Sequence, residues 1–306
     1  KMHADLQVEA AGAGAIPIIR PLKQSMAGNN ITEIIGIVNG TTNYILTKMT
    51  ESGMNYKDAL AKATELGYAE ADPTADVEGY DAGRKMAILS SIAFNSRVTF
   101  YQVYTEGITK ITAEDIKYAK EFGYVIKLLG LARNTPDGIE VKVHPMLIDE
   151  NHPLATVRDS FNAVFVHGEA SDDTMFMGRG AGQMPTASAG MGDIIDVCRN
   201  IVHGSCGKIG CSCYKELPVK DISETKSKFF LRIEALDKQG VLANIASVLG
   251  NNDVSIAQVV QKSRKDGVAE LVIITDVVAE KNFNDAMTVF NGLSEVKEIA
   301  GVILVY

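Results

Sequence analysis

Residues 63–85 read ATELGYAEADPTADVEGYDAGRK, a stretch that combines a cluster of carboxylates with two cations, three glycines and a proline. Apolar residues recur with helical spacing directly after it, which predicts a helix over residues 81–94. Asp81 and Lys85 are four positions apart on that helix, so their side chains can meet. A lysine held among carboxylates in a cleft is typical of a proton-transfer site.

The same spacing also fits a solvated surface ion pair, which contributes less than ~1 kcal/mol to stability. The loop before the helix favours a buried site instead. Its glycines and proline fix a backbone path that brings Glu70 and Asp76 towards the start of the helix. Apolar residues further along the helix indicate that it is buried rather than peripheral.

Outward from this stretch, the sequence predicts alternating strands and helices of an α+β fold. Asn39-Gly40 marks a turn, Gly67 a helix end and Thr112 a helix N-cap. The predicted strands are 31–38, 101–104, 125–134, 139–147 and 163–168. The predicted helices open at Thr42 and cover 56–66, 81–94, 113–122 and, after a glycine-rich segment at 177–192, 193–202.

The pattern changes after residues 214–227, a polar segment with a proline that we interpret as a linker. From residue 228 the order is strand, helix, two strands, helix and strand, as in a ferredoxin-like βαββαβ sandwich. The predicted organisation is therefore a short remnant at 1–7, a larger domain at 8–213, the linker, and a small domain at 228–306.

Composition limits the classes of partner. The formal net charge of -8 argues against nucleic acid and anionic membranes, because both need basic patches. No apolar run approaches the ~20 residues that span a bilayer, and no signal-peptide pattern opens the chain. A cytoplasmic protein is expected.

Three of the four cysteines, Cys206, Cys211 and Cys213, lie close together after His203. Reduced cytosolic thiols on a loop are the simpler interpretation. A zinc site that uses His203 and these thiolates is the alternative, although the spacing matches no common zinc motif.

The stretch at 63–85, with Asp-Pro at 72–73 and Gly-Tyr-Asp at 79–81 before Lys85, resembles the signature of the homoserine dehydrogenase family. Residues 39–46 (NGTTNYIL) and the Glu-Ala segment from Glu9 to Pro17 are similar to two further family segments. The resemblance implies reversible hydride transfer between a nicotinamide cofactor and C4 of the substrate, which interconverts L-aspartate 4-semialdehyde and L-homoserine. It also implies a mixed sheet with helices on one face.

By this resemblance Lys85 is the general acid/base, and Asp81 orients it or holds the substrate hydroxyl. Glu70 binds the substrate ammonium and Asp76 supports the network. Tyr68, Asn39 and Thr41 complete the substrate site.

The resemblance implies NAD(P) as the cofactor, with contacts at Gly67, Gly182 and Lys1. Gly182 belongs to a glycine-rich run that otherwise reads as a tight turn. No G-x-G-x-x-G follows a strand near the start of the sequence, so we expect most of the nucleotide-binding domain to be absent from it. The choice between NAD and NADP therefore stays open.

A monovalent cation, Na+ or K+, is expected at Glu9 with the backbone carbonyls of Gly12, Gly14 and Ile16. The family usually has valine where this chain has Gly12, but a backbone ligand does not depend on the side chain. The alternative is a buried glutamate that caps a helix.

The last domain resembles ACT domains at Leu236–Leu242, which implies binding of a small amino acid, with L-threonine as the expected feedback inhibitor. The alternatives are a domain that only dimerises and, for the whole chain, a non-catalytic amino-acid sensor. A homodimer or homotetramer is expected from the family. The predicted effector contacts are Asp237, Gly240, Val241, Leu242, Asn252 and Gln258.

Overall fold

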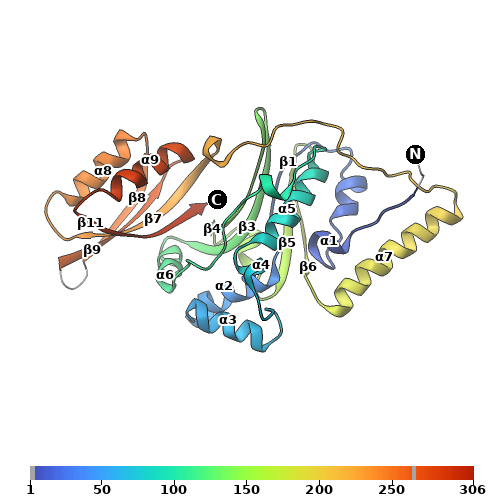
Figure 1. The fold of residues 1–306 in the computed structure, drawn as a ribbon, viewed down its shortest axis with the longest axis horizontal. Coiled ribbons are helices and arrows are strands. Elements are labelled where there is room, and N and C mark those ends of the chain that lie inside the picture. Colours follow the sequence, from blue (N-terminus) through green and yellow to red (C-terminus); the bar gives the residue numbers. More distant parts are fainter. Residues whose placement is uncertain (1–3, 264–266) are drawn as a thin grey trace. The chain divides into compact units, whose positions relative to one another are not determined.

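The computed structural model describes residues 4–263 and 267–306, and the chain forms two compact units (Figure 1). The first unit comprises Lys1–Thr109, Lys127–His144 and Asn151–Lys220. The second comprises Lys110–Ile126, Pro145–Glu150 and Asp221–Tyr306. The chain therefore passes between the units several times, and each unit is described separately.

The first unit is built on a mixed sheet in the order β6-β5-β1-β3-β4. The β1–β3, β1–β5 and β5–β6 pairs are antiparallel, whereas the short strand β2 pairs with β4 in parallel. The sheet confirms the predicted fold class. The strands are β1 (Ile31–Ile37), β2 (Tyr104–Thr105), β3 (Tyr124–Thr135), β4 (Gly138–Asp149), β5 (Phe161–Gly168) and β6 (Asp172–Arg179).

Three helices of this unit pack directly on the sheet: α1 and α2 contact β5, and α5 contacts β1. Helix α2 begins where the Asn39 side chain accepts a hydrogen bond from Thr42 N (2.9 Å), and it ends at the left-handed Gly53. The helices are α1 (Ala10–Ala13), α2 (Gly40–Ser52), α3 (Tyr56–Glu65), α4 (Thr74–Val77), α5 (Tyr80–Ala93) and α7 (Gln183–Val202), with short turns of π or 3-10 helix at Pro21–Ser25, Phe100–Gln102 and Pro153–Thr156.

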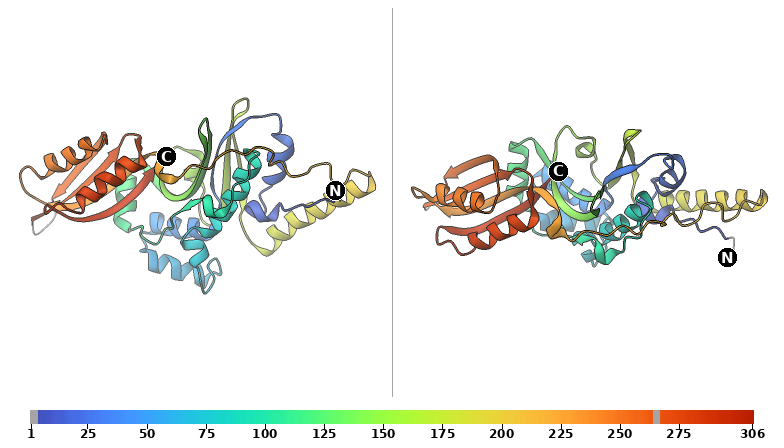
Figure 2. Two further views of the ribbon diagram at one scale, coloured as in Figure 1. Left: turned by 45° about the horizontal axis from the view of Figure 1, so that its top comes forward. Right: turned by 90° about the horizontal axis from the view of Figure 1, so that it is seen from above.

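Helix α7 is held by the segment that precedes α1, and the two run side by side in both views of Figure 2. Gln7 Nε2 donates to Asp196 Oδ2 (2.9 Å), and Asn200 Nδ2 donates to Asp5 Oδ2 (2.9 Å). Asp193 is the one buried residue of α7. Asp193 also accepts a hydrogen bond from this N-terminal segment, at Glu9 N, so polar contacts fix one face of α7.

Two predictions for this unit were wrong. The strand predicted at 101–104 is reduced to β2, which begins only at Tyr104, because Thr99 and Gln102 close a capping box that winds Phe100–Gln102 into a 3-10 turn. The helix predicted at 193–202 begins ten residues earlier, at Gln183, and the preceding strand β6 was missed. Gly190 and Gly192 lie in the open on α7, so each costs only the ~1 kcal/mol propensity penalty of glycine.

The second unit contains the predicted βαββαβ order. Its sheet runs β11-β7-β9-β8 with every neighbouring pair antiparallel, as in a ferredoxin-like sandwich. The elements are β7 (Lys226–Leu236), α8 (Val241–Asn251), β8 (Ile256–Ser263), β9 (Val268–Thr275), β10 (Val278–Ala279), α9 (Glu280–Phe290) and β11 (Val296–Val305), with a 3-10 turn at Ile222–Glu224.

An additional helix, α6 (Ala113–Glu121), also belongs to this unit, with Thr112 as its N-cap as predicted. Phe229 on β7 stacks on Phe283 of α9, with ring centroids 3.6 Å apart. Arg232 lies three residues further along β7, so its side chain emerges from the opposite face of the strand. Helices α9 and α6 therefore cover opposite faces of the sheet.

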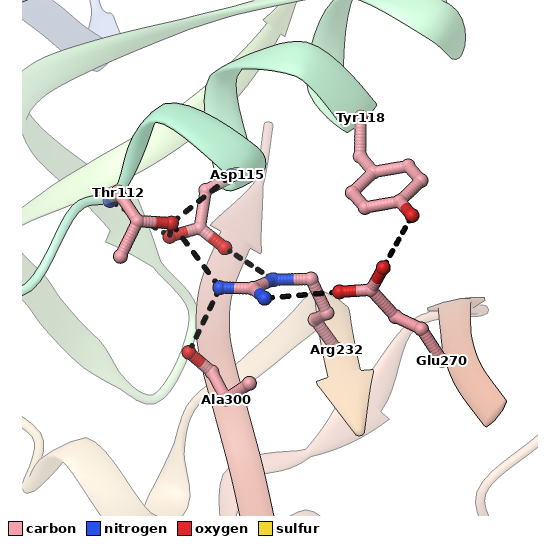
Figure 3. A network of polar contacts seen from close by, with 6 residues as sticks. All are labelled: Thr112, Asp115, Tyr118, Arg232, Glu270 and Ala300. Carbon is pink, nitrogen blue, oxygen red and sulfur yellow. Dashed lines mark hydrogen bonds and ion pairs between the residues drawn. The ribbon is translucent and has the colours of Figure 1, made fainter. Parts of the chain in front are cut away.

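Helix α6 is joined to the sheet by a buried network of charges (Figure 3). Arg232 Nε donates to Asp115 Oδ1 (2.9 Å), and Arg232 Nη1 donates to Glu270 Oε1 (3.0 Å). Tyr118 donates its hydroxyl to the other oxygen of Glu270. Because removal of one partner from a buried ion pair costs ~3–5 kcal/mol, this network fixes α6 on the sheet.

Within residues 4–263 and 267–306, no helix combines the length and the hydropathy needed to cross a membrane.

Candidate functional site

The site is centred on Asn39, which lies between the end of β1 and the start of α2. Its Oδ1 accepts hydrogen bonds from the backbone N–H and the hydroxyl of Thr42 (2.9 and 3.0 Å). Its Nδ2 donates to Asp76 Oδ1 (2.6 Å) and to Asp81 Oδ2 (2.8 Å). The buried amide thus uses its donors and acceptor fully, and it holds two carboxylates from separate elements at one point.

Lys85 reaches the same point from α5. Its Nζ donates to Asp81 Oδ2 (2.7 Å) and to the carbonyl of Val38 (3.0 Å). The Lys85 side chain is only 19% exposed, and that of Asp81 32%. The pair is therefore held between fixed acceptors instead of moving freely on the surface. An ammonium has three protons, so one remains for a ligand.

Thr41, Tyr68 and Gly67 form a second group beside α2. The Thr41 hydroxyl donates to the carbonyl of Tyr68 (2.8 Å), and the Tyr68 ring lies 4.9 Å from that of Tyr44. Gly67, with a φ of 75°, allows the chain to turn out of α3 into this segment. Glu70 lies two residues after Tyr68 and is exposed. Among the described residues no hydrogen bond or ion pair involves its carboxylate.

Glu9 is buried, and its carboxylate is surrounded by backbone N–H groups. Oε1 accepts from Ile18 and Ile19 (2.5 and 2.7 Å), and Oε2 accepts from Arg20 (2.9 Å). This arrangement matches the interpretation of Glu9 as a helix-capping carboxylate. No cationic side chain pairs with it among residues 4–263 and 267–306.

Asp193, which the sequence did not single out, completes this region. It accepts from Glu9 N (2.9 Å) and from Arg20 Nη2 (2.8 Å). The predicted helix began at Asp193, so the sequence did not indicate that this residue lies in the middle of α7, where it faces the Glu9 segment.

The glycine-rich loop before α7 packs on the Glu9 segment. A Cβ at Gly14 would lie 2.0 Å from the Gly180 carbonyl oxygen, so the two backbones approach closely. Gly182, with a φ of 124°, is the N-cap of α7. At Gly12 a side chain would meet Ile19 at 3.2 Å, so the valine usual in the family would require a shift there. The third cofactor candidate, Lys1, lies outside the described residues.

The predicted effector residues do not all lie together. Gly240 is the left-handed N-cap of α8, and Leu242 is partly exposed beside it, whereas the Val241 side chain is buried. Asn252 is occupied at the other end of α8, where its Nδ2 donates to Val248 O (2.8 Å). Gln258 lies on the exposed surface of β8.

Among the described residues, no group of three or more histidine, cysteine, aspartate or glutamate side chains is arranged to hold a metal ion. The zinc alternative for His203 and the neighbouring cysteines therefore gains no support.

Lys127, on β3, is a buried lysine that the sequence did not reveal, because its neighbours on the strand are apolar. Its Nζ donates to Asn43 Oδ1 (3.0 Å) and to Val157 O (2.6 Å). Asn43 in turn donates to the carbonyls of Asp159 and Phe161 (2.9 and 3.2 Å). Burial lowers the pKa of Lys127 to about 8. Together the two side chains hold the segment before β5 against α2, the helix that starts at the site.

The first unit, with its lysine–carboxylate–amide cluster, and the second, ferredoxin-like unit define the chain as an α+β enzyme with a regulatory domain. A family model described as homoserine dehydrogenase matches residues 17–195, and one described as ACT domain matches residues 229–295. The chain belongs to the homoserine dehydrogenase family, whose members are NAD(P)-dependent oxidoreductases that act on a CH–OH group.

Relatives support this assignment along nearly the whole chain. The homoserine dehydrogenase of Corynebacterium glutamicum is 46% identical over 306 residues, which cover 98% of this chain and 68% of the relative. The crystal structure of a homoserine dehydrogenase from Thiobacillus denitrificans aligns with a TM-score of 0.93 at 40% identity, covering 98% of this chain and 70% of that one.

A more distant neighbour is a hyperthermophilic archaeal homoserine dehydrogenase mutant in complex with NADPH. It aligns with a TM-score of 0.54 at 28% identity, covering 63% of this chain and 55% of that one.

Lys127 gives a prediction for stability against pH. Between pH 8 and 10.5 the unfolded lysine keeps a proton that the folded one has lost, so folding is favoured as pH rises. Relative to Lys127→Met, the free energy of unfolding of the wild type should therefore rise over this window. The shift from 10.5 to about 8 corresponds to on the order of 3 kcal/mol, at ~1.4 kcal/mol per pKa unit.

Urea unfolding followed by circular dichroism measures this difference, since the chain has no tryptophan. Lys48→Met is the control. The hydrogen bond to Asp159 raises the pKa of Lys48, so its contribution is fully present below 10.5 and should not rise over the same window. Parallel curves for wild type and Lys127→Met would contradict the prediction.

Proposed function

We propose that Lys85 is the general acid/base of L-homoserine and L-aspartate 4-semialdehyde interconversion in this chain. The observation that carries the proposal is the continuous set of hydrogen bonds from Lys85 through Asp81 and Asn39 to Asp76. When bound, the nicotinamide ring supplies hydride to C4 of the semialdehyde or accepts it from homoserine. Lys85 then donates a proton to the aldehyde oxygen as negative charge develops there, or removes it from the alcohol in the reverse direction.

The remaining polar groups supply the substrate contacts. Helix α2 begins at the site with Gly40 and Thr41. The N–H groups at a helix N-terminus favour an anion, here the carboxylate of the substrate. Glu70 is an acid without a protein partner among the described residues, which supports its role as the anion for the substrate ammonium. Asp76 keeps Asn39 in place and so maintains the position of Asp81.

The residues proposed to hold NAD(P) are Gly67, Gly182 and Lys1. At Gly182 the donors are backbone N–H groups at the start of α7, which suit a phosphate. The NADPH complex of the archaeal neighbour supports a dinucleotide of this kind. We further propose a catalytic domain at 8–213 and a regulatory domain at 228–306, joined by a linker at 214–227. The proposed assembly is a homodimer or homotetramer.

The proposed role of Lys85 predicts a loss of turnover. In the intact protein, Lys85→Ala should lower kcat by ~10²-fold or more, the usual scale for an acid/base group, with a smaller effect on KM. Lys62→Ala, which removes an exposed lysine of α3, is the control and should keep normal turnover. Circular dichroism checks that both variants fold. Near-normal turnover of Lys85→Ala would refute the role of Lys85 as the acid/base, whereas a lack of turnover in the intact wild type would favour the alternative of a non-catalytic amino-acid sensor.

A monovalent cation is proposed at Glu9, with the carbonyls of Gly12, Gly14 and Ile16. Glu9 is a buried carboxylate without a cationic partner in the described residues, and its oxygens keep lone pairs beyond the three N–H donors. The carbonyls of Gly14 and Ile16 accept none of the backbone hydrogen bonds recorded for the described loops and turns. This donor set suits Na+ or K+.

If this proposal is right, Na+ or K+ should raise the melting temperature relative to a bulky organic cation, and Glu9→Gln should abolish that rise. Glu65→Gln, at an exposed glutamate of α3, is the control and should keep it. A melting temperature of the wild type that does not respond to these cations would contradict the site.

An amino acid, L-threonine in this pathway, is proposed as the effector of the ACT domain. At the start of α8 the Val241 N–H donates to Lys238 O (3.4 Å), and the following N–H groups of Leu242 and Ala243 are available for the carboxylate. Within the described residues no hydrogen bond or ion pair reaches the Asp237 carboxylate, which can therefore accept the ammonium. These two features support binding rather than dimerisation alone.

Isothermal titration should detect threonine binding to the wild type, and Asp237→Asn should weaken it by about tenfold or more, as loss of a charged partner does. Asp276→Asn, between β9 and β10, should leave the affinity unchanged. If titration with millimolar threonine releases or absorbs no heat, threonine is not the effector of the ACT domain.

A further inference from the structure

Two cysteines lie one residue apart in the segment that returns from α7 to the first unit. The bond from Tyr214 N to Ser212 O (3.0 Å) closes a tight turn around Cys213. Lys23 Nζ donates to Gly210 O (3.3 Å) just before the pair, and Lys215 N donates to Asn95 O (2.8 Å) just after it. The segment is thus fixed on both sides of Cys211 and Cys213.

The two sulfurs have different environments. Cys211 is exposed. The neighbouring Cys213, chiefly through its backbone N–H, and the charges of Lys23 and Arg97 lower the pKa of Cys211. Cys213 is half-buried, with Sγ 3.7 Å from the Ser91 carbonyl oxygen, and burial raises its pKa. The more reactive thiolate therefore forms at the exposed sulfur, beside a protonated second thiol.

We propose that Cys211 and Cys213 form a thiol–disulfide exchange site for an anionic low-molecular-weight disulfide. Lys23 and Arg97 favour a negatively charged reagent over a cationic one. Neither the acid/base cluster nor the ACT domain uses these residues.

The exchange takes place in two balanced steps. The Cys211 thiolate attacks one sulfur of the small disulfide RSSR, the S–S bond breaks, and RS⁻ leaves as Cys211–S–S–R forms. The Cys213 thiol then gives its proton to the released thiolate and attacks the Cys211 sulfur, so that the bond from Cys211 to SR breaks and a second RS⁻ leaves. The products are the Cys211–Cys213 disulfide, one RSH and one RS⁻ that takes its proton from solvent, so the protein loses two electrons and the small disulfide gains them.

The test treats the fully reduced chain with glutathione disulfide or with cystamine, a cationic disulfide, and follows each cysteine by peptide mass spectrometry. The wild type should give a 211–213 disulfide. In Cys213→Ser the glutathione adduct should accumulate on Cys211, because the second step is blocked. In Cys211→Ser, residue 213 should stay reduced.

Cys198, exposed on α7, is the internal control, and Cys211 should react with glutathione disulfide about tenfold faster or more. Lys23→Gln removes a positive charge near the pair. It should therefore remove most of the preference for glutathione disulfide over cystamine. Equal rates at Cys198 and Cys211, or a Cys213→Ser variant without an accumulated adduct, would overturn the proposal.

Discussion

The amide of Asn39 is the contact on which the arrangement of the site depends. It caps α2 with its oxygen and holds Asp76 and Asp81 with its nitrogen, so one side chain connects β1, α2, α4 and α5. The two carboxylates approach the same nitrogen, an arrangement in which like charges would repel. The amide protons and the Lys85 ammonium balance that repulsion. The lysine is therefore positioned by the same contacts that hold the helices together.

Much of this cluster could be predicted from the sequence because its parts are local. Asp81 and Lys85 are one helical turn apart, and Asn39 follows a strand and precedes a helix, where an N-cap is expected. The contact from Lys85 to the Val38 carbonyl could not be predicted, because it joins positions 47 residues apart through the packing of α5 on β1. Lys127 is a similar case: its partners lie on α2 and in the segment before β5, and only the folded sheet brings them together.

The errors in the fold have the same origin. Strand β6 shows little alternation of its own and is specified by its long antiparallel register with β5. Helix α7 was predicted too short because Gly190 and Gly192 resemble a helix break, although each lies where an added side chain would meet no neighbouring atom. At residues 100–102, by contrast, a local capping box prevailed over the apolar pattern of a strand. Long-range pairing decided the first case and local hydrogen bonding the last.

The regulatory unit is not a continuous segment of the chain. The ACT family model covers residues 229–295, yet the Arg232 face of its sheet is closed by α6, which comes more than a hundred positions earlier. Without α6, Arg232 would lose Asp115, and Glu270 would lose the Tyr118 hydroxyl. Gly301 on β11 fits the same arrangement, since a Cβ there would lie 2.6 Å from Asp115 Oδ1. Helix α6 follows α5 in the chain and precedes β3, so the polypeptide that carries Lys85 continues directly into the regulatory unit. The helix that packs on the ACT sheet is therefore covalently continuous with the elements of the proposed active site.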